Sequence, residues 1–286
     1  ISSPGVKNWM EYRPLEGFVL AITPFNFTAI AGNLPTAPAL LGNTVIWKPS
    51  HTQMFSAHFL MQLLEEAGLP PGVINMVGAE GRKAGPALLS QRDLAGVHFT
   101  GSTATFESIY RHVGENISGY DSYPRIVGET GGKDFVFAHP SADPEALATA
   151  LIRGAFEYQG QKCSAASRAY IPRSLWSEVC ERLVAEIKTI KMGDVQDFGN
   201  FMNAVIDDRS YKNIVAYLDH ARNHADAEIL VGGGHDEKTG YFVEPTVILT
   251  SDPRYRSMRE EIFGPVLTVF VYEDASLEET IQACNQ

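Results

Sequence analysis

The stretch "AGVHFTGSTAT" (residues 95–105) decides the fold class, because a predicted strand in it leads directly into a predicted helix. Short apolar runs with turn residues around them predict four more strands in this half of the chain. These runs are "GFVLAIT" (17–23), "NTVIWK" (43–48), "VINMV" (73–77) and "RIVG" (125–128). Strands that alternate with helices predict a mostly parallel sheet with helices on its faces, which is an α/β fold.

A helix is predicted over residues 52–67, and Gly68 ends it. Its apolar residues recur at intervals of four and therefore share one face. They are Phe55, Phe59, Leu63 and Ala67.

The second half of the chain, from about residue 131, repeats the alternation of strands and helices. Asp143 followed by Pro144 predicts a helix start, and that helix should end before Gly160. Ser174 is expected to begin the next helix. Strands are predicted at "DFVFA" (134–138), "RAYIP" (168–172), "YFVEPTVIL" (241–249) and "GPVLTVFVY" (264–272). This half therefore predicts a second α/β unit.

Composition narrows the class of protein. A length of 286 residues suggests about two domains, and the net charge of −11 argues against nucleic acid or an anionic membrane as partner. No apolar run approaches the roughly 20 residues of a membrane-spanning helix. Three cysteines do not make a disulfide framework and favour a reducing compartment. Because the chain starts at Ile1 and stops inside a helical pattern, we expect a segment of a longer protein, truncated at both ends.

The three cysteines differ in their surroundings. Cys180 shares an apolar stripe with Val179 and Leu183 at helical spacing, and Cys284 shares one with Ile281. Both are expected to be packing residues. Cys163 belongs to no stripe.

Cys163 lies in the loop "EYQGQKCSA" (157–165), after Gly160 and next to Lys162. A neighbouring cation favours the thiolate, which is the reactive form of cysteine. The residues alone leave open whether Cys163 is a nucleophile or a structural thiol.

A cysteine that attacks a carbonyl needs a donor for the oxyanion and a base. Asn26 follows the strand at 17–23 between two phenylalanines, where its amide is well placed to be that donor; a turn residue is the less favoured alternative. Glu129 follows the strand at 125–128 in a glycine-rich loop and could be the base, or an exposed loop glutamate. His220 and His224 are four apart on a predicted helix, but a third ligand is not evident, and no metal site is expected.

Five motifs occur in order along the chain. They are "PFNFTAIAGNLPTAPALLGNTVIWKPS" (24–50), "FTGS" (99–102), "GETGGKD" (128–134), "GQKCSA" (160–165) and "EEIFGP" (260–265). The series resembles the NAD(P)-dependent aldehyde dehydrogenase superfamily over almost the whole chain. The resemblance implies part of an oligomerisation strand region at 1–16, part of a Rossmann-like NAD-binding domain at 17–130, and an α/β catalytic domain at 131–286 that lacks its C-terminal part.

The resemblance also implies catalytic roles. Cys163 would attack the aldehyde, Asn26 would hold the oxyanion together with the Cys163 backbone N–H, and Glu129 would activate water to hydrolyse the thioester. Within the superfamily, "GETGGKDFVF" (128–137) and "GNFMNAVID" (199–207) are similar to the members that oxidise L-glutamate γ-semialdehyde to L-glutamate in proline catabolism.

Further roles follow from the same resemblance. Ser102 would contact the NAD pyrophosphate at a helix start. Phe106 stands where the family often has glycine, and His51 stands where many members have a glutamate. The residues implied to bind NAD are Lys48, Gly101, Ser102, Glu261 and Phe263, and those implied to bind the substrate are Phe27, Lys162 and Ser164.

The implied partners are a small-molecule substrate and further copies of the chain, as a homodimer or larger homo-oligomer. The implied location is the mitochondrial matrix in a eukaryote or the cytoplasm in a bacterium. Two other activities stay open: another NAD(P)-dependent aldehyde dehydrogenase, and a cysteine hydrolase or acyltransferase. A non-catalytic protein of the same fold is a third alternative, which the presence of Cys163 and Glu129 disfavours.

Overall fold

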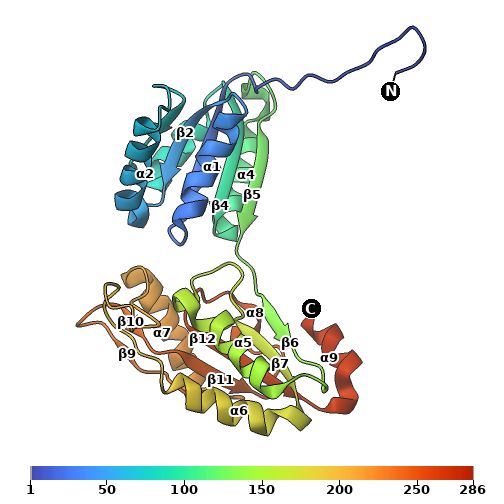
Figure 1. The fold of residues 1–286 in the computed structure, drawn as a ribbon, viewed down its shortest axis with the longest axis vertical. Coiled ribbons are helices and arrows are strands. Elements are labelled where there is room, and N and C mark those ends of the chain that lie inside the picture. The colour runs from blue at the N-terminus through green and yellow to red at the C-terminus, as the bar shows by residue number, and fades with distance from the viewer. Residues whose placement is uncertain (1, 286) are drawn as a thin grey trace. The chain divides into compact units, whose positions relative to one another are not determined.

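The computed structural model describes residues 2–285, which divide into two units between Gly131 and Gly132 (Figure 1). The first unit contains the strands β1 (Phe18–Thr23), β2 (Thr44–Pro49), β3 (Ile74–Met76), β4 (Leu94–Gly101) and β5 (Arg125–Thr130). Its helices are α1 (Thr28–Leu40), α2 (Met54–Glu66), α3 (Gly81–Leu89) and α4 (Thr103–Glu115), with short 3-10 helices at His51–Gln53 and Ile117–Gly119. The five strands predicted in this half are therefore confirmed.

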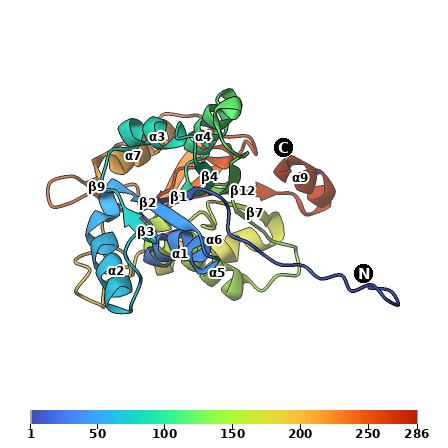
Figure 2. The same ribbon diagram turned by 90° about the horizontal axis from the view of Figure 1, so that it is seen from above.

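The sheet of the first unit is parallel throughout, in the order β3-β2-β1-β4-β5. Successive side chains of β1 point to opposite faces, as the two-residue period of a strand requires. Phe18 and Leu20 pack with α3 and α4, whereas Val19 and Ala21 pack with α1 and α2. The helices thus cover both faces of this sheet, α1 and α2 on one and α3 and α4 on the other (Figure 2).

Helix α1 contains two prolines, and its sequence did not predict it. Pro38 has no N–H to donate to the carbonyl oxygen of Leu34. The Nδ1 of His98 on β4 lies 3.0 Å from that oxygen and satisfies it from outside the helix. Packing against the sheet therefore replaces a hydrogen bond that the helix cannot make by itself.

Helix α2 begins two residues later than predicted and presents a different face to the sheet. Phe55, Phe59 and Leu63 are 80%, 53% and 60% exposed, while Ala57 is buried and Leu60 packs near it. The helix is apolar on more than one side, so the spacing of Phe55, Phe59 and Leu63 could not tell which side packs.

The second unit has a five-stranded sheet in the order β6-β7-β12-β11-β8, in which β8 alone is antiparallel. Its strands are β6 (Phe135–Phe137), β7 (Arg168–Pro172), β8 (Ala227–Val231), β11 (Thr246–Thr250) and β12 (Val266–Tyr272), with the small pair β9 (His235–Asp236) and β10 (Phe242–Val243). Its helices are α5 (Pro144–Phe156), α6 (Arg173–Ile187), α7 (Asp208–Arg222), α8 (Arg256–Arg259) and α9 (Leu277–Cys284), with 3-10 helices at Glu157–Gly160 and Asp274–Ser276.

This second sheet is also covered on both faces. Ala169 and Ile171 of β7 join the core with α5 and α6, and Tyr170 between them joins the core with α7. The predicted start of α5 is confirmed, because the Asp143 carboxylate accepts the Ala146 N–H at 2.8 Å and a proline follows it.

Two details of the prediction for this unit are wrong. The predicted strand over 241–249 is two strands, β10 and β11, which separate at Pro245 because proline has no N–H for a ladder. Cys180 is only half-buried on α6, whereas Val179 and Leu183 form the buried stripe. Burial and the nearby Glu228 raise the pKa of the Cys180 thiol. Cys284 is buried, as predicted.

Candidate active site

Most of the catalytic and NAD-binding residues predicted in the first unit lie at or just beyond the carboxyl ends of its strands. Because the strands are parallel, Ile22 pairs with both Lys48 and Phe99, and Thr100 pairs with Glu129. The segments that follow β1, β2, β4 and β5 therefore leave the sheet at one edge. The order of strands reverses between β1 and β4, and ligands of open α/β sheets bind outside the carboxyl ends at such a switch point.

Asn26 lies just beyond β1 and is only 6% exposed. The end of that strand is fixed by the buried Trp47 side chain, whose Nε1 donates to Thr23 Oγ1 at 3.0 Å. The half-buried Phe27 follows as the residue before α1. A buried amide at the end of a fixed strand has the rigidity that an oxyanion donor needs.

Glu129 is not in a loop, as the sequence suggested, but inside β5, opposite Thr100. Its side chain is exposed. The strand runs two residues further than predicted because Glu129 and Thr130 continue the ladder with β4. The ladder fixes the backbone from which this carboxylate projects.

The start of α4 has the features of a phosphate site. Ser102 caps the helix by accepting the Thr105 N–H at 3.3 Å, and the helix runs for 13 residues from Thr103. Residue 101 has to be glycine for this packing, because a Cβ there would lie 2.7 Å from the Phe99 ring. The backbone at Gly101 therefore carries no side chain that would keep a ligand away. Backbone N–H groups at a helix start attract anionic groups.

Lys48 is the last residue but one of β2, at the same edge. Its ammonium group donates to the Pro49 carbonyl at 3.0 Å, and burial lowers the pKa of Lys48. Gly81, the first residue of α3, faces it, because a Cβ there would be 3.7 Å from the Lys48 Nζ. His51 lies exposed at the start of the short 3-10 helix that follows β2. The edge thus offers two helix starts and a lysine, which fits a dinucleotide.

Phe106, which departs from the family's glycine, is accommodated by a glycine on the neighbouring strand. Its ring stacks on Phe99 at 5.7 Å and covers Gly128, where a Cβ would lie 2.1 Å from the ring. The large side chain therefore packs against the ends of β4 and β5 and does not project from the helix start.

In the second unit, the loop that carries Cys163 is unusual in its backbone. Tyr158, Gln159 and Gly160 are consecutive residues in the left-handed region, with φ of 56°, 58° and 64°. For residues other than glycine this conformation costs about 1–2 kcal/mol each. Cys163 is partly exposed and Ser164 is exposed. Stored strain of this kind clusters at functional sites, where surrounding structure enforces it.

Two buried glutamines supply that enforcement. Gln159 Nε2 donates to the Ala204 carbonyl at 3.1 Å, and Gln161 Oε1 accepts the Ile206 N–H at 2.9 Å. Sequence reasoning missed both glutamines, although their partners lie in the quoted motif at 199–207. They attach the Cys163 loop to a segment some 45 residues away.

The loop at 260–265 lies beside the Cys163 loop. A Cβ on Gly160 would come within 2.3 Å of the Gly264 carbonyl oxygen, and Phe263 is left-handed with φ of 58°. Glu261 accepts the Gly132 N–H at 3.2 Å, and partial burial raises the pKa of its carboxyl. In the second unit, the loop of Cys163 and the loop that carries Glu261 and Phe263 are therefore in close backbone contact.

Lys162 is held by an ion pair. Its Nζ lies 2.6 Å from Glu157, which also binds Arg153 at 2.6 Å, and the Lys162 hydrogen bond is the main cause that lowers the pKa of Glu157. The lysine side chain is 21% exposed. Its position is thus fixed next to Cys163.

Other features of the described residues do not join these sites. His220 and His224 stack at 5.1 Å, and no group of three potential metal ligands occurs among residues 2–285. The three cysteines form no disulfide. None of the helices in the described chain is both long and apolar enough to span a membrane.

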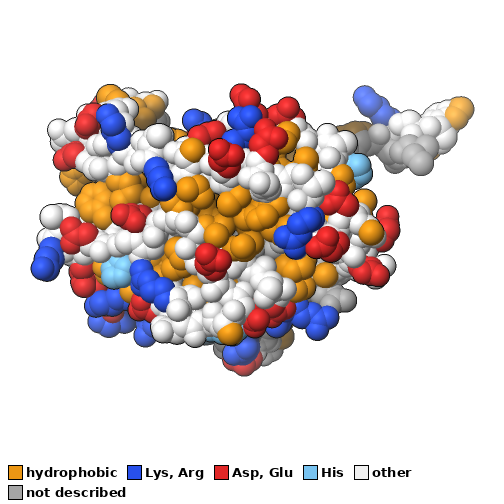
Figure 3. Space-filling view, turned by 90° about the horizontal axis from the view of Figure 1, so that it is seen from below, with side chains coloured by type: hydrophobic (Ala, Val, Ile, Leu, Met, Phe, Trp, Pro, Cys, Tyr) orange, Lys and Arg blue, Asp and Glu red, His pale blue; other side chains and the backbone are white. Residues whose placement is uncertain are grey.

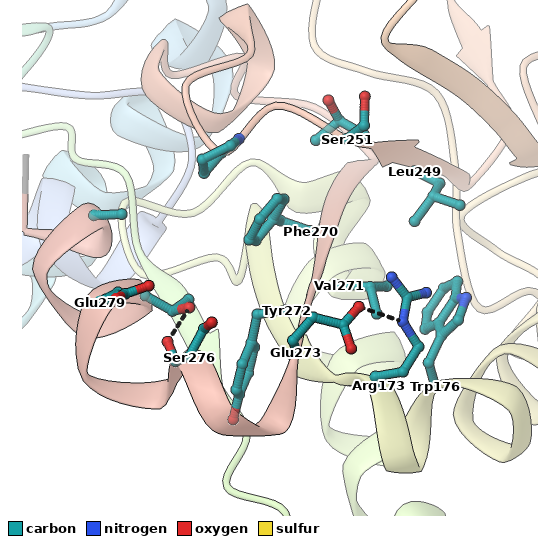
Figure 4. A pocket seen from close by; sticks show the side chains of 14 residues that line it. Arg173, Trp176, Leu249, Ser251, Phe270, Val271, Tyr272, Glu273, Ser276 and Glu279 are labelled. Carbon is teal, nitrogen blue, oxygen red and sulfur yellow. Dashed lines mark hydrogen bonds and ion pairs between the residues drawn. The ribbon is translucent and has the colours of Figure 1, made fainter.

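A cavity of about 540 Å³ lies between α6, α9 and the end of β12 (Figure 4). Phe270 and Trp176 line it, and Arg173 and Glu273 pair across 3.0 Å at its rim. Within the described chain, its lining includes none of the residues predicted for catalysis or cofactor binding.

The fold and these motifs define the class of protein. The chain belongs to the aldehyde dehydrogenase family, whose family model matches residues 1–286. It is 54% identical to Delta-1-pyrroline-5-carboxylate dehydrogenase, mitochondrial, of Dictyostelium discoideum over 100% of the chain and 51% of the relative. It is 50% identical to the human protein of the same name over 99% of the chain and 50% of that relative.

A solved structure gives the same result. The Delta-pyrroline-5-carboxylate dehydrogenase of Mycobacterium tuberculosis bound with NAD is 55% identical, with a TM-score of 0.93 over 99% of this chain and 51% of that one. The aldehyde dehydrogenase fold predicted from the sequence is confirmed. The chain spans about half the length of the curated relatives it matches.

Proposed function

We propose that the protein containing this chain oxidises L-glutamate γ-semialdehyde, which arises from Δ1-pyrroline-5-carboxylate, to L-glutamate in proline catabolism. The observation that carries the proposal is the similarity, over the whole chain, to relatives named for pyrroline-5-carboxylate dehydrogenase activity. Two structural features support the same chemistry. They are the strained loop around Cys163 and the switch point between β1 and β4 of the first unit, where ligands of such sheets bind.

In the proposed mechanism, the Cys163 thiolate adds to the aldehyde carbon and forms a thiohemiacetal. The Asn26 amide and the Cys163 backbone N–H donate to the oxyanion, where such donors are most effective. When bound, NAD would supply the acceptor for the hydride, and the oxidised adduct would be a thioester on Cys163. Glu129 takes a proton from water, whose oxygen attacks the thioester and releases the carboxylate product and the thiol.

The residues at the strand edge of the first unit would hold the pyrophosphate and the adenine ribose of NAD. Gly101 and Ser102 would meet its pyrophosphate at the α4 start, and Lys48 its adenine ribose. Glu261 would bind the nicotinamide ribose and Phe263 would pack on the nicotinamide. The support is the bare helix start at Gly101 and the Lys48 ammonium beside Gly81.

The substrate would be held by the neighbours of the nucleophile. Lys162 and Ser164 flank Cys163, and Phe27 would pack on the aliphatic stem. The ion pair of Lys162 with Glu157 fixes the lysine in place, which supports a positioning role.

The test is NADH formation by the active protein with glutamate γ-semialdehyde and, separately, with simple aliphatic aldehydes. Cys163→Ala should lower oxidation by about 10³-fold or more and leave NAD binding intact. Cys180→Ala on α6 is the matched control and should keep activity. Oxidation retained by Cys163→Ala would refute the nucleophile, and thioester or ester hydrolysis without NADH would favour a cysteine hydrolase.

We also propose a location: the mitochondrial matrix if the protein is eukaryotic and the cytoplasm if it is bacterial.

We further propose that the protein is a homodimer or larger oligomer. Residues 2–16 extend away from the sheet of the first unit, with Trp9 and Tyr12 at 70% and 91% exposed (Figure 1). Light scattering of Trp9→Ser with Tyr12→Ser should report a smaller species than wild type. An unchanged mass would refute this role of the segment.

A further inference from the structure

A second cavity, of about 650 Å³, lies in the second unit beside β7, α7 and α8. Five lysine or arginine side chains line it against two carboxylates, and two histidines complete the wall. The chain as a whole carries a net charge of −11, and Figure 3 shows acidic and basic side chains intermixed on the face it views. The concentration of positive charge in this cavity is therefore a local feature.

Lys133 is the most unusual group of this cavity. Its Nζ is buried from solvent and has no hydrogen-bond partner within residues 2–285. Burial, and next the charge of Arg168, lower the pKa of Lys133 to about 7, and the smaller opposite effects of Glu261 and Glu260 do not offset them. A buried donor without a partner is rare in folded proteins, and a bound anion is one way in which such a group is satisfied.

Four arginines line the cavity, and contacts fix the orientation of two of them, Arg168 and Arg256, while Arg259 is exposed at its wall. Arg168 donates from Nε to the Lys133 carbonyl and from Nη1 to the Tyr170 hydroxyl, each at 3.1 Å. Arg256 donates to Glu260 at 2.9 Å and lies 4.3 Å from the centroid of the Tyr217 ring. A guanidinium has five N–H groups, so these contacts leave donors for a ligand. Fixed guanidinium groups match the two oxygens of a carboxylate or a phosphate.

The charges also decide the sign of the ligand. The stacked His220 and His224 could suggest a metal, but the surrounding cations repel one, and His220 already binds the Tyr255 hydroxyl at 2.8 Å. An anion would be attracted by the same cations and would accept a hydrogen bond from Lys133.

We propose that this cavity binds a small anion with two or more carboxylate or phosphate groups, held by Lys133, Arg168 and Arg259. The site is separate from the Cys163 loop in its lining residues. Its volume lies in the range of small-molecule sites.

The experiment is calorimetric titration of the intact protein at pH 7 with pyrophosphate and with citrate, against KCl of matched ionic strength. Binding is expected for at least one anion, and which of them binds identifies phosphate or carboxylate as the source. Lys133→Met and Arg259→Gln should each weaken it by roughly 10-fold or more. Lys188→Met, an exposed lysine of the same unit, is the matched control and should bind as wild type.

Circular dichroism identifies a variant that fails to fold. If Lys133→Met does not fold, the binding measured with Arg259→Gln decides the test, because the Arg259 side chain is outside the buried core. The proposal is overturned if folded wild type binds neither anion above the KCl control. It is also overturned if the folded variants bind with the affinity of wild type.

Discussion

Gly160 and Gly264 lie backbone to backbone: a Cβ atom on Gly160 would stand 2.3 Å from the carbonyl oxygen of Gly264. A Cβ on Gly264 would in turn stand 2.5 Å from the buried Ile214. The loop of Cys163 can approach the loop of Phe263 this closely only because residue 160 is glycine. Gly264 in turn allows the loop of Phe263 to lie against Ile214 of α7. The placement of the two loops thus depends on two missing side chains.

The first prediction concerns this contact. Gly160→Ala should lower the free energy of unfolding by about 2 kcal/mol or more, because alanine is strained at φ of 64° and meets a backbone atom. Oxidation should fall by about 10²-fold as Cys163 is displaced. Urea unfolding and NADH formation measure the two effects. Gly114→Ala, with open space around it in α4, should raise the free energy of unfolding by no more than about 1 kcal/mol.

The second prediction concerns Glu129. If this carboxylate activates water, Glu129→Gln should keep a rapid first turnover of NADH and slow the steady rate by about 10²-fold or more. Stopped-flow absorbance separates the two phases. Glu107→Gln, exposed on α4, serves as control and should leave both phases unchanged. Equal loss of burst and steady rate in Glu129→Gln would contradict the role.

The third prediction tests the packing of Phe106 over Gly128. Gly128→Ala should destabilise the protein by about 1–3 kcal/mol, because the new methyl group overlaps the Phe106 ring. In a Phe106→Ala background, the same change should cost much less. A double-mutant cycle by urea unfolding measures the difference. Additive effects would show that the ring does not confine Gly128.

The fourth prediction follows from Lys133. Its folded pKa of about 7 lies below the ordinary 10.5, so between these pH values the unfolded chain holds a proton that the folded chain lacks. Stability relative to Lys133→Met should therefore rise with pH across this window, by at most about 5 kcal/mol in total. Below pH 7 the difference should be constant, with the methionine variant more stable.

Urea unfolding from pH 6 to 9 in NaCl measures this dependence. Lys188→Met is expected to show no such trend relative to wild type, since its side chain is exposed. A wild-type curve parallel to that of Lys133→Met would contradict the lowered pKa.

Much of the fold could be predicted because strands and caps leave local signals. The β-strands of the first unit and the Asp143 cap were evident from short runs and single residues. Helix α1 was not, because its two prolines oppose a helix and the contact with His98 compensates from a distant segment. The exposed face of Phe55 and the half-exposed Cys180 were missed for a similar reason: periodicity shows that residues share a face, not what covers it.

The sequence predicted which residues belong to the candidate site, but it did not predict their backbone conformation or burial. The motif order pointed to Cys163, Asn26 and Glu129, and the strand pairing places the last two at one edge of their sheet. The left-handed backbone before Cys163 and the buried ammonium of Lys133 could not be read from the chain, because each depends on contacts between distant segments.

The hydrogen bond between His98 and the Leu34 carbonyl has a consequence for the order of folding. The Leu34 carbonyl of α1 is satisfied by a strand 64 residues further along the chain, so during synthesis this hydrogen bond cannot form before β4 has emerged. The pairing of β1 with its second neighbour, β4, also forms only then. In refolding followed by pulsed hydrogen exchange, we expect the amides of α1 to gain protection together with those of β4 and not before them.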